Sequence, residues 1–256
     1  DIKPYLDKPI LERKNYIPGR MLPIMTSKGC VKKCSFCYNT IINRSIWRAY
    51  DLKRVFYEMD YLMYNYGVTG WLFYDDNFFI DKDRAWRILE RYKMPSSIEV
   101  DINRINEQFL EKAKRCNVSK LYIGIESGAD SMLKRMHKVM TLETIKQKVD
   151  LINTSGLRAD LSFMMLFPNE TASELNATFE LVHELERLPN IKIDGPKVYK
   201  PYPGTEFFKQ MIQMAWLTPV TNEEWSKYER NMSVTNLKYL YDDNYIKILE
   251  KEGLIL

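Results

Sequence analysis

Short apolar runs alternate with helical patterns six times along this 256-residue chain, and this alternation constrains the fold more than any other feature. Strands that are separated by helices pair in parallel through right-handed crossovers. A closed eightfold barrel takes about 250 residues, and the lead-in and the tail of this chain leave room for only about six units. We therefore predict an α/β fold, a partial (β/α)6 TIM-like barrel, with a doubly wound open sheet as the alternative. The expected strands are Leu22–Thr26, Trp71–Tyr74, Ser97–Asp101, Lys120–Ile125, Ala159–Leu166 and Lys197–Lys200.

The helices expected between these strands carry start and stop residues. Asp81 and Asn106 stand where an N-cap belongs, Gly67 and Gly156 follow helical patterns, and Thr171 with Glu174 has the form of a capping box. These signals predict helices at Asp51–Tyr66, Lys82–Tyr92, Glu107–Cys116, Asp130–Met136 and Thr141–Ser155, then from the capping box to Leu188, and from Thr205 to Ala215.

The predicted domain organisation has three parts. Residues 1–20 contain three prolines and no sustained period, which indicates an extended lead-in or linker. Residues 21–216 form the barrel, and residues 217–256 form a helical extension with short helices at Asn222–Arg230 and Asp242–Leu249. The chain begins with Asp1 rather than methionine, as expected of a processed chain or of one domain of a longer protein.

Composition and charge bear on several classes of protein. The net charge of +4 is spread along the chain, so nucleic-acid binding is neither indicated nor excluded. No apolar run approaches the roughly 20 residues of a membrane helix, and no signal-peptide pattern is present. Four cysteines, three of them clustered, suit a reducing compartment, so we expect a cytoplasmic protein.

The three clustered cysteines are candidate metal ligands. Cys30-x3-Cys34-x2-Cys37 lies in a loop rich in Lys, Ser, Asn and Gly, where a buried structural role is unexpected, whereas a buried thiol is expected for Cys116. A closed zinc site needs four ligands, and only Cys116, His137 and His183 remain to supply the fourth. An iron–sulfur cluster with one open iron needs only these three thiolates. A disulfide network would leave one of them unpaired.

Acidic residues, a serine and a Pro-Gly pair lie at or near the carboxyl ends of four other expected strands, where parallel α/β folds bind their ligands. These are Asp75-Asp76, Glu99, Glu126-Ser127 and Pro203-Gly204, and they are expected on one rim with the cysteine loop. Each acid taken singly is equally explained as a cap of the following helix or as a residue that lies in solvent.

The cysteine spacing, with Phe36 just before the last cysteine, resembles the motif of the radical S-adenosylmethionine (radical SAM) superfamily. The resemblance implies that Cys30, Cys34 and Cys37 bind three irons of a [4Fe–4S] cluster. It implies that S-adenosylmethionine chelates the fourth iron and yields a 5′-deoxyadenosyl radical that abstracts hydrogen from a small-molecule or peptide substrate. An external electron donor such as a flavodoxin or ferredoxin is implied as well.

Two further segments extend the resemblance to most of the chain, about Leu22 to Phe208. Phe73-Tyr-Asp-Asp-Asn-Phe78 is similar to the segment that takes the place of the family's Gly-Gly-Glu strand, so Asp75 and Asp76 would receive the methionyl amino group. Leu121-Tyr-Ile-Gly-Ile-Glu-Ser-Gly128 resembles the family's "G-[IV]-E/Q-S" strand. By this likeness Glu126, with Ser127 beside it, would face the ribose, and Lys138 would hold the methionyl carboxylate.

Other matches concern the nucleoside. The resemblance implies that Glu99 contacts the ribose, that Ser162 lies near the nucleoside, and that Phe36 packs the adenine. Pro201-Tyr-Pro-Gly-Thr205 looks like the family's "P-x-P-G-T" end of strand six. The chain departs from the family in having Lys28-Gly29 for Arg-Gly, and Leu166-Phe167-Pro168 for Gly-Leu-Pro, which leaves less room near the nucleoside.

Within the superfamily, the lead-in, the Thr-Ser-Lys-Gly-Cys segment that ends at Cys30 and the Asp-Asp-Asn-Phe segment most resemble cobalamin (B12)-dependent enzymes, many of which transfer methyl groups. Either this chain is only the radical domain and a cobalamin-binding domain lies upstream of Asp1, or the enzyme works without cobalamin. The residues assign neither a substrate nor a catalytic side chain. The alternatives are a zinc-stabilised (β/α) binding module without redox chemistry, and a non-catalytic relic, against which the three retained cysteines argue.

Overall fold

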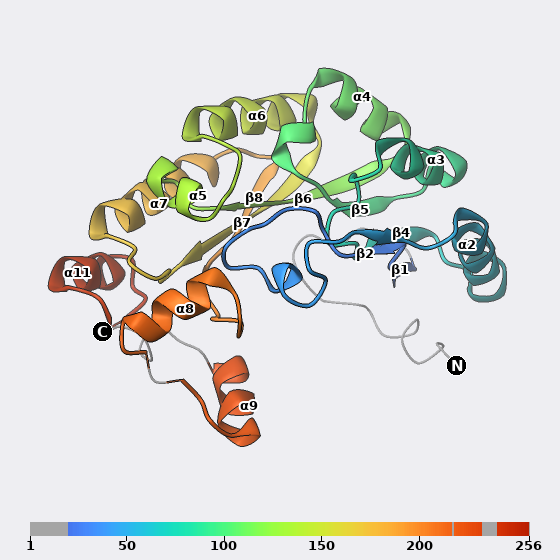
Figure 1. Ribbon diagram of the computed structural model, residues 1–256. Coiled ribbons are helices and arrows are strands. Elements are labelled where there is room, and N and C mark those ends of the chain that lie inside the picture. Colours follow the sequence, from blue (N-terminus) through green and yellow to red (C-terminus); the bar gives the residue numbers. More distant parts are fainter. Residues whose placement is uncertain (1–19, 217, 232–239, 256) are drawn as a thin grey trace. The chain divides into compact units, whose positions relative to one another are not determined.

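Six strands form one sheet in this computed structural model, which describes residues 20–216, 218–231 and 240–255 (Figure 1). Their order in the sheet is their order along the chain, and the pairs β1–β4, β4–β5 and β5–β6 are parallel. Helices separate consecutive strands of this sheet, so the predicted α/β class is confirmed. The strands are β1 (Met21–Ile24), β4 (Gly70–Phe73), β5 (Ser96–Glu99), β6 (Val118–Glu126), β7 (Arg158–Met165) and β8 (Ile191–Val198).

The chain divides into two compact units. Unit 1 contains the described residues up to Val31 together with Ser45–Ile123 and Lys148–Asp160. Unit 2 contains Lys32–Arg44, Gly124–Gln147 and the described residues from Leu161 onward. The predicted boundaries after residues 20 and 216 stay predictions, and nearly all of the predicted lead-in lies outside the described residues.

The helices of unit 1 begin and end where local chemistry predicts. Asp51 accepts hydrogen bonds from the amides of Lys53 and Arg54 at the start of one helix, and Gly67 ends it in the left-handed conformation. Asp81 and Asn106 cap the next two helices as predicted. The three are α2 (Leu52–Tyr66), α3 (Lys82–Tyr92) and α4 (Glu107–Arg115), and Cys116 follows the last as a buried thiol.

The helices of unit 2 include the predicted capping box, in which Thr171 and Glu174 bond to each other's backbone at the start of α7 (Ala172–Leu185). That helix ends three residues before the predicted Leu188. The others are α5 (Asp130–Arg135), α8 (Glu206–Gln213), α9 (Asn222–Asn231) and α11 (Asp243–Lys251), while α6 (Leu142–Ser155) runs through both units. Helix α11 packs against α7 (Figure 1).

The predicted sixth strand was wrong in its bounds. It was expected at Lys197–Lys200, but β8 begins six residues earlier, at Ile191, and ends at Val198. Pro196 lies inside this strand, although proline lacks the N–H that a central strand donates. β8 is the last strand in the sheet order, and an edge strand has one side without a partner to satisfy, so proline is tolerated there.

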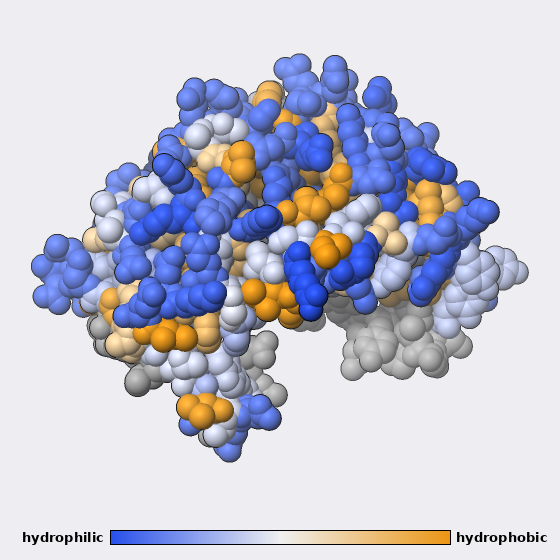
Figure 2. Space-filling view, in the orientation of Figure 1, coloured by the Kyte–Doolittle hydropathy of each residue, from blue (hydrophilic) through white to orange (hydrophobic). Residues whose placement is uncertain are grey.

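Buried apolar residues concentrate on the inner faces of the helices, and Figure 2 shows mostly hydrophilic side chains over α4 and α6. In unit 2 one core cluster joins the ends of β7 and β8 to α8 and α11, through Leu166, Phe167, Tyr199, Phe207 and Tyr245. Within the described part of the chain, no helix is long and apolar enough to cross a membrane.

Candidate functional site

A short antiparallel ladder closes the base of the cysteine loop. Strand β2 (Ser27–Lys28) pairs with β3 (Arg48–Ala49), and neither strand was predicted. Cys30 is buried and belongs with this ladder to unit 1, whereas Cys34 and Cys37 are half-buried and belong to unit 2. Among the described residues, no group of three or more His, Cys, Asp or Glu side chains is placed to hold a metal ion. The assignment of the cysteines as ligands therefore stays a prediction from their spacing.

Asp75 is fully buried and fastens the start of the cysteine loop. Its Oδ2 accepts from the amide of Thr26 at 3.1 Å, and its Oδ1 accepts from the hydroxyls of Thr26 at 2.8 Å and Ser27 at 2.5 Å. Burial raises the pKa of Asp75, although these hydrogen bonds oppose the shift. The described contacts of this predicted cofactor residue therefore hold the chain between β1 and the cysteines.

Asp76 holds the next part of the same loop. Its Oδ2 accepts from the amide of Gly29 at 2.7 Å, directly before Cys30. Gly29 has φ +85°, a left-handed conformation that favours glycine. Both acids that follow β4 thus bond to the backbone from Thr26 to Gly29, which the strand prediction alone did not indicate.

In unit 2, the segment from Cys34 to Cys37 is fastened through Ser35. The amide of Ser35 donates to the carbonyl of Met136 at 3.2 Å, and its own carbonyl accepts from the amide of Phe207 at 3.1 Å. The hydroxyl of Ser35 lies 2.8 Å from the carbonyl of Arg135. These bonds tie the segment to the end of α5 and the start of α8.

Phe36, between two of the cysteines, lies against an aromatic cluster. Its ring centroid is 5.9 Å from that of Phe167, which is 5.3 Å from Tyr199 and 5.8 Å from Phe207. The Phe36 ring is half-buried, so one part of it contacts this cluster and another part is accessible. Its predicted packing against adenine stays a prediction.

Glu126 and Lys138 form an ion pair at the end of β6. Lys138 Nζ lies 3.0 Å from Glu126 Oε1 and also donates to the carbonyl of Gly124, and the two side chains are only 12% and 10% exposed. Glu126 Oε2 is buried and has no hydrogen-bond partner within the described residues. Glu126 also has φ +76°, which is rare outside glycine and is found at functional sites.

Gly124 leaves the space that this pair occupies. A Cβ at Gly124 would overlap Glu126 Oε1 and come within 3.1 Å of Lys138 Nζ. The φ of Gly124 lies outside the left-handed region, so the role of this glycine is steric. A glycine is therefore required at position 124, two residues before Glu126, because any side chain there would collide with the ion pair.

The other predicted cofactor residues take different positions. Ser127 is fully buried, and its hydroxyl lies 3.1 Å from that of Thr178 on α7, so its described contacts are internal. Ser162 is buried on β7, and Glu99 is the half-buried last residue of β5. Among the predicted cofactor-binding residues, Glu126 and Lys138 are thus the pair described in direct contact with each other.

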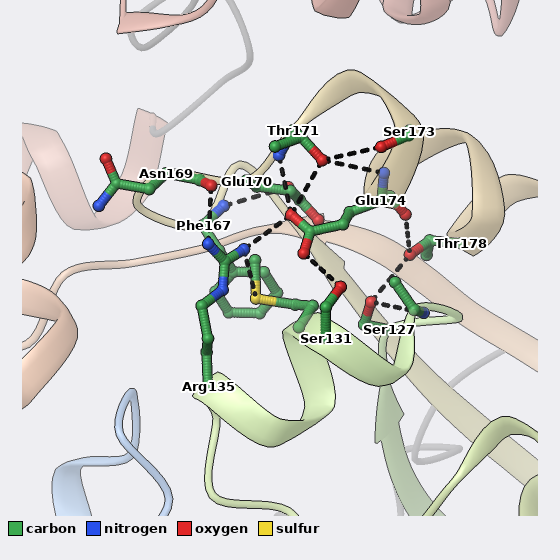
Figure 3. Close-up of polar contacts among 12 residues, drawn as sticks. Ser127, Ser131, Arg135, Phe167, Asn169, Glu170, Thr171, Ser173, Glu174 and Thr178 are labelled. Atoms are coloured by element: carbon green, nitrogen blue, oxygen red, sulfur yellow. Dashed lines mark hydrogen bonds and ion pairs between the residues drawn. The ribbon is translucent and has the colours of Figure 1, made fainter.

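A polar network links α5 to the start of α7 (Figure 3). Arg135 lies 2.7 Å from Glu174 Oε2 and donates to the carbonyl of Asn169 at 2.9 Å, while Ser131 bonds to Glu174 Oε1 at 2.5 Å. Burial opposes ionisation of Glu174, but the bonds from Ser131 and Thr171 and the charge of Arg135 together lower its pKa. This network holds α5, whose end carries the carbonyls that bind Ser35.

Sequence reasoning missed Glu170, which lies four residues before Glu174 (Figure 3). Its carboxylate is buried, and Oε2 accepts from Tyr245 Oη at 2.6 Å and from the amides of Leu166 at 2.8 Å and Phe167 at 3.3 Å. Burial raises its pKa to about 7, because these bonds only partly offset the loss of hydration. No local signal distinguishes it, because the tyrosine comes from 75 residues further along the chain.

Comparisons with known proteins agree on a family. The family model described as "Radical SAM superfamily" matches residues 24–182. An uncharacterized methyltransferase of Pyrococcus horikoshii is 30% identical over 89% of this chain and 49% of its own length. Cytidylyl-2-hydroxyethylphosphonate methyltransferase of Streptomyces wedmorensis is 22% identical over 90% of this chain and 44% of its own.

A solved structure shares the fold. The radical S-adenosylmethionine methyltransferase TsrM of Kitasatospora setae, with cobalamin and a [4Fe-4S] cluster bound, superposes with a TM-score of 0.64 at 16% identity. The match covers 79% of this chain and 38% of that protein. This chain therefore spans about half the length of the curated relatives it matches, and less of this structure.

Proposed function

This chain belongs to the radical SAM superfamily, and on that premise we propose that it binds a [4Fe–4S] cluster and cleaves S-adenosylmethionine reductively. When bound, a reduced cluster supplies the electron that releases a 5′-deoxyadenosyl radical, which abstracts hydrogen from a substrate. Cys30, Cys34 and Cys37 would hold three irons, and an external flavodoxin or ferredoxin would supply the electron. The substrate and the side chains that act on it are not assigned.

The donor set fits such a cluster. Three thiolates within eight residues suit a cubane that keeps one iron open for an exogenous ligand. Their loop is fastened on both sides, by Asp75 and Asp76 in unit 1 and through Ser35 in unit 2. Loop backbone that is fixed before the ligand binds loses less conformational entropy on binding.

The observation that carries the proposal is the pair of Glu126 and Lys138. The buried Glu126 Oε2 has no partner in the described part of the chain and can accept from a hydroxyl of a ribose. Lys138 makes two described contacts, and an ammonium group has three N–H donors, so it can also donate to the methionyl carboxylate. An acceptor and a cation held together therefore suit the two ends of S-adenosylmethionine.

We further propose that this chain is the radical domain of a larger methyltransferase that uses cobalamin. Support comes from the relatives named as methyltransferases and from the cobalamin-bound structure with the same fold. Each of these proteins is longer than the part matched here. Transfer of a methyl group to a carbon or phosphorus atom is the reaction class that this proposal predicts.

The zinc-stabilised binding module is less well supported. It needs a fourth ligand, and Cys116 is buried at the end of α4, while His183 Nε2 lies 3.1 Å from Glu252. The remaining candidate, His137, lies with Nδ1 3.3 Å from the Ser35 hydroxyl. Membership of the superfamily favours iron and sulfide over zinc.

Anaerobic reconstitution with iron and sulfide tests the proposal. We expect brown protein with about four irons per chain and formation of 5′-deoxyadenosine when S-adenosylmethionine and a reductant are added. Cys37→Ala should lose the cluster, whereas Cys116→Ala should keep it as the matched control. Colourless protein that binds a single zinc ion tightly would rule the proposal out.

A further inference from the structure

The turn after β7 is held by two tyrosines from the C-terminal part of the chain. Tyr245 Oη bonds to Glu170 at 2.6 Å and accepts from the amide of Leu166 at 3.1 Å, and Tyr241 Oη donates to the carbonyl of Phe167 at 2.9 Å. The two tyrosine rings stack with centroids 4.3 Å apart. Contacts from α11 and the residues just before it therefore reach the backbone of the turn directly.

This turn needs such support because of its backbone. Leu166 has φ +62°, in the left-handed region that favours glycine, and its side chain is fully buried. A leucine keeps this conformation only when its surroundings over-determine it. The amide of Leu166 is bonded to Glu170 and Tyr245, and both backbone groups of Phe167 are bonded to Glu170 and Tyr241.

The fixed backbone sets the position of the Phe167 ring. That ring contacts Phe36, with centroids 5.9 Å apart, and also Phe207, at 5.8 Å. The amide of Phe207 in turn donates to the carbonyl of Ser35 at 3.1 Å. Phe167 thus contacts the segment between Cys34 and Cys37 by two routes. It contacts Phe36 directly, and it contacts Phe207 of α8, whose amide binds Ser35.

We propose that Glu170 and Tyr245 are positioning residues that hold Phe167 in place, so that Phe36 and the Cys34–Cys37 segment keep the geometry required to bind S-adenosylmethionine. The C-terminal helix α11 then supports the cofactor-binding segment in addition to packing against α7. This inference rests on the proposed function, because it assigns a cofactor-binding role to the supported segment. Neither residue is proposed to touch the cofactor, so their effect on its binding is indirect.

Hydrogen–deuterium exchange on the full chain tests the coupling without any cofactor. Tyr245→Phe removes one hydroxyl and keeps the ring, and it should speed exchange about tenfold at Leu166, Phe167 and residues 34–37, as expected for a lost buried hydrogen bond. Tyr92→Phe is the matched control, because Tyr92 Oη also bonds to a carboxylate, that of Asp60, at 2.9 Å in unit 1. The control should affect only α2 and α3.

Affinity for S-adenosylmethionine, measured by equilibrium dialysis on reconstituted protein, tests the consequence. Tyr245→Phe and Glu170→Ala should each weaken binding about tenfold at unchanged iron content. Glu170→Gln keeps an oxygen that accepts from the two amides. Unlike Glu170→Ala, it should therefore show the slow exchange and the affinity for S-adenosylmethionine of the wild type. Such a rescue is not expected from a general loss of stability.

The outcomes separate this inference from the proposed function. Suppose that the wild type binds S-adenosylmethionine. The inference is then overturned if Tyr245→Phe binds it with wild-type affinity, or if hydrogen exchange in this variant is faster evenly over the whole chain. If the wild type fails to bind it, the proposed function fails. In that case the exchange at residues 34–37 still decides whether α11 is coupled to the cysteine segment.

Discussion

The ammonium group of Lys138 lies 3.0 Å from Glu126 Oε1, and both side chains are almost completely removed from water. A buried charge that loses its partner costs several kcal/mol, because it keeps its desolvation penalty without compensation. This pair links the stability of the fold to the proposed binding of S-adenosylmethionine.

Replacing Lys138 with methionine should therefore destabilise the chain. We expect a loss of about 3 kcal/mol in the free energy of unfolding, measured by urea denaturation. The double variant Glu126→Gln with Lys138→Met should recover about half of that loss, since no buried charge is left unpaired. Lys146→Met breaks the exposed pair with Glu184 and should change stability by less than about 1 kcal/mol. Equal losses in both lysine variants would contradict this account.

Glu170 should make stability fall as the pH rises. Its pKa is raised from 4.5 to about 7 in the folded chain, so its favourable contribution is complete below about pH 4.5 and is lost as the pH passes through about 7. The loss is about 3 kcal/mol, at about 1.4 kcal/mol per tenfold change in proton affinity. Glu170→Gln should lack this component, so the stability difference between variant and wild type should change between pH 4.5 and pH 8. A constant difference would refute the shift.

Glu174 should behave in the opposite way. Its pKa is lowered in the folded chain, so its contribution is present above the unfolded value of 4.5 and is lost as the pH falls through the folded value. Glu174→Gln should cost about 1.5 kcal/mol at pH 7, through weaker bonds to Ser131, Thr171 and Arg135, and less below pH 4. Denaturation curves at the two pH values check this, with Glu184→Gln on the same helix as control. A cost that does not shrink in acid would argue against the network.

Asp75→Asn should loosen the start of the cysteine loop. The amide of Thr26 donates to Asp75 Oδ2, and the hydroxyls of Thr26 and Ser27 donate to Oδ1. An asparagine NH2 group would face the amide donor at the first position and would have to reverse both hydroxyl bonds at the second, and the charged acceptor is lost in either orientation. We expect a loss of about 2 kcal/mol in unfolding free energy and less iron retained after reconstitution. Asp51→Asn, at the exposed cap of α2, should cost under about 1 kcal/mol and leave the iron content unchanged. Full iron retention in Asp75→Asn would show that this buried carboxylate does not support the loop.

Strand and helix positions could largely be predicted because local signals decide them. Asp81, Asn106 and Thr171 cap helices as expected, because a short polar side chain satisfies orphan amides wherever a helix begins. The bounds of β8 could not be predicted, because the tolerance of Pro196 depends on the strand lying at the edge of the sheet. Whether a strand lies at the edge depends on the arrangement of the whole sheet, so it cannot be predicted from the residues of that strand alone.

The candidate site divides in the same way. The sequence alone identified the spacing of Cys30, Cys34 and Cys37 and the motif that contains Glu126. These features depend only on which residues are present and on how far apart they lie along the chain. The joining of Lys138 to Glu126 and of Tyr245 to Glu170 was decided only by the tertiary structure. The first bond spans 12 residues and the second 75. Burial makes both bonds strong, since water no longer competes for the carboxylate.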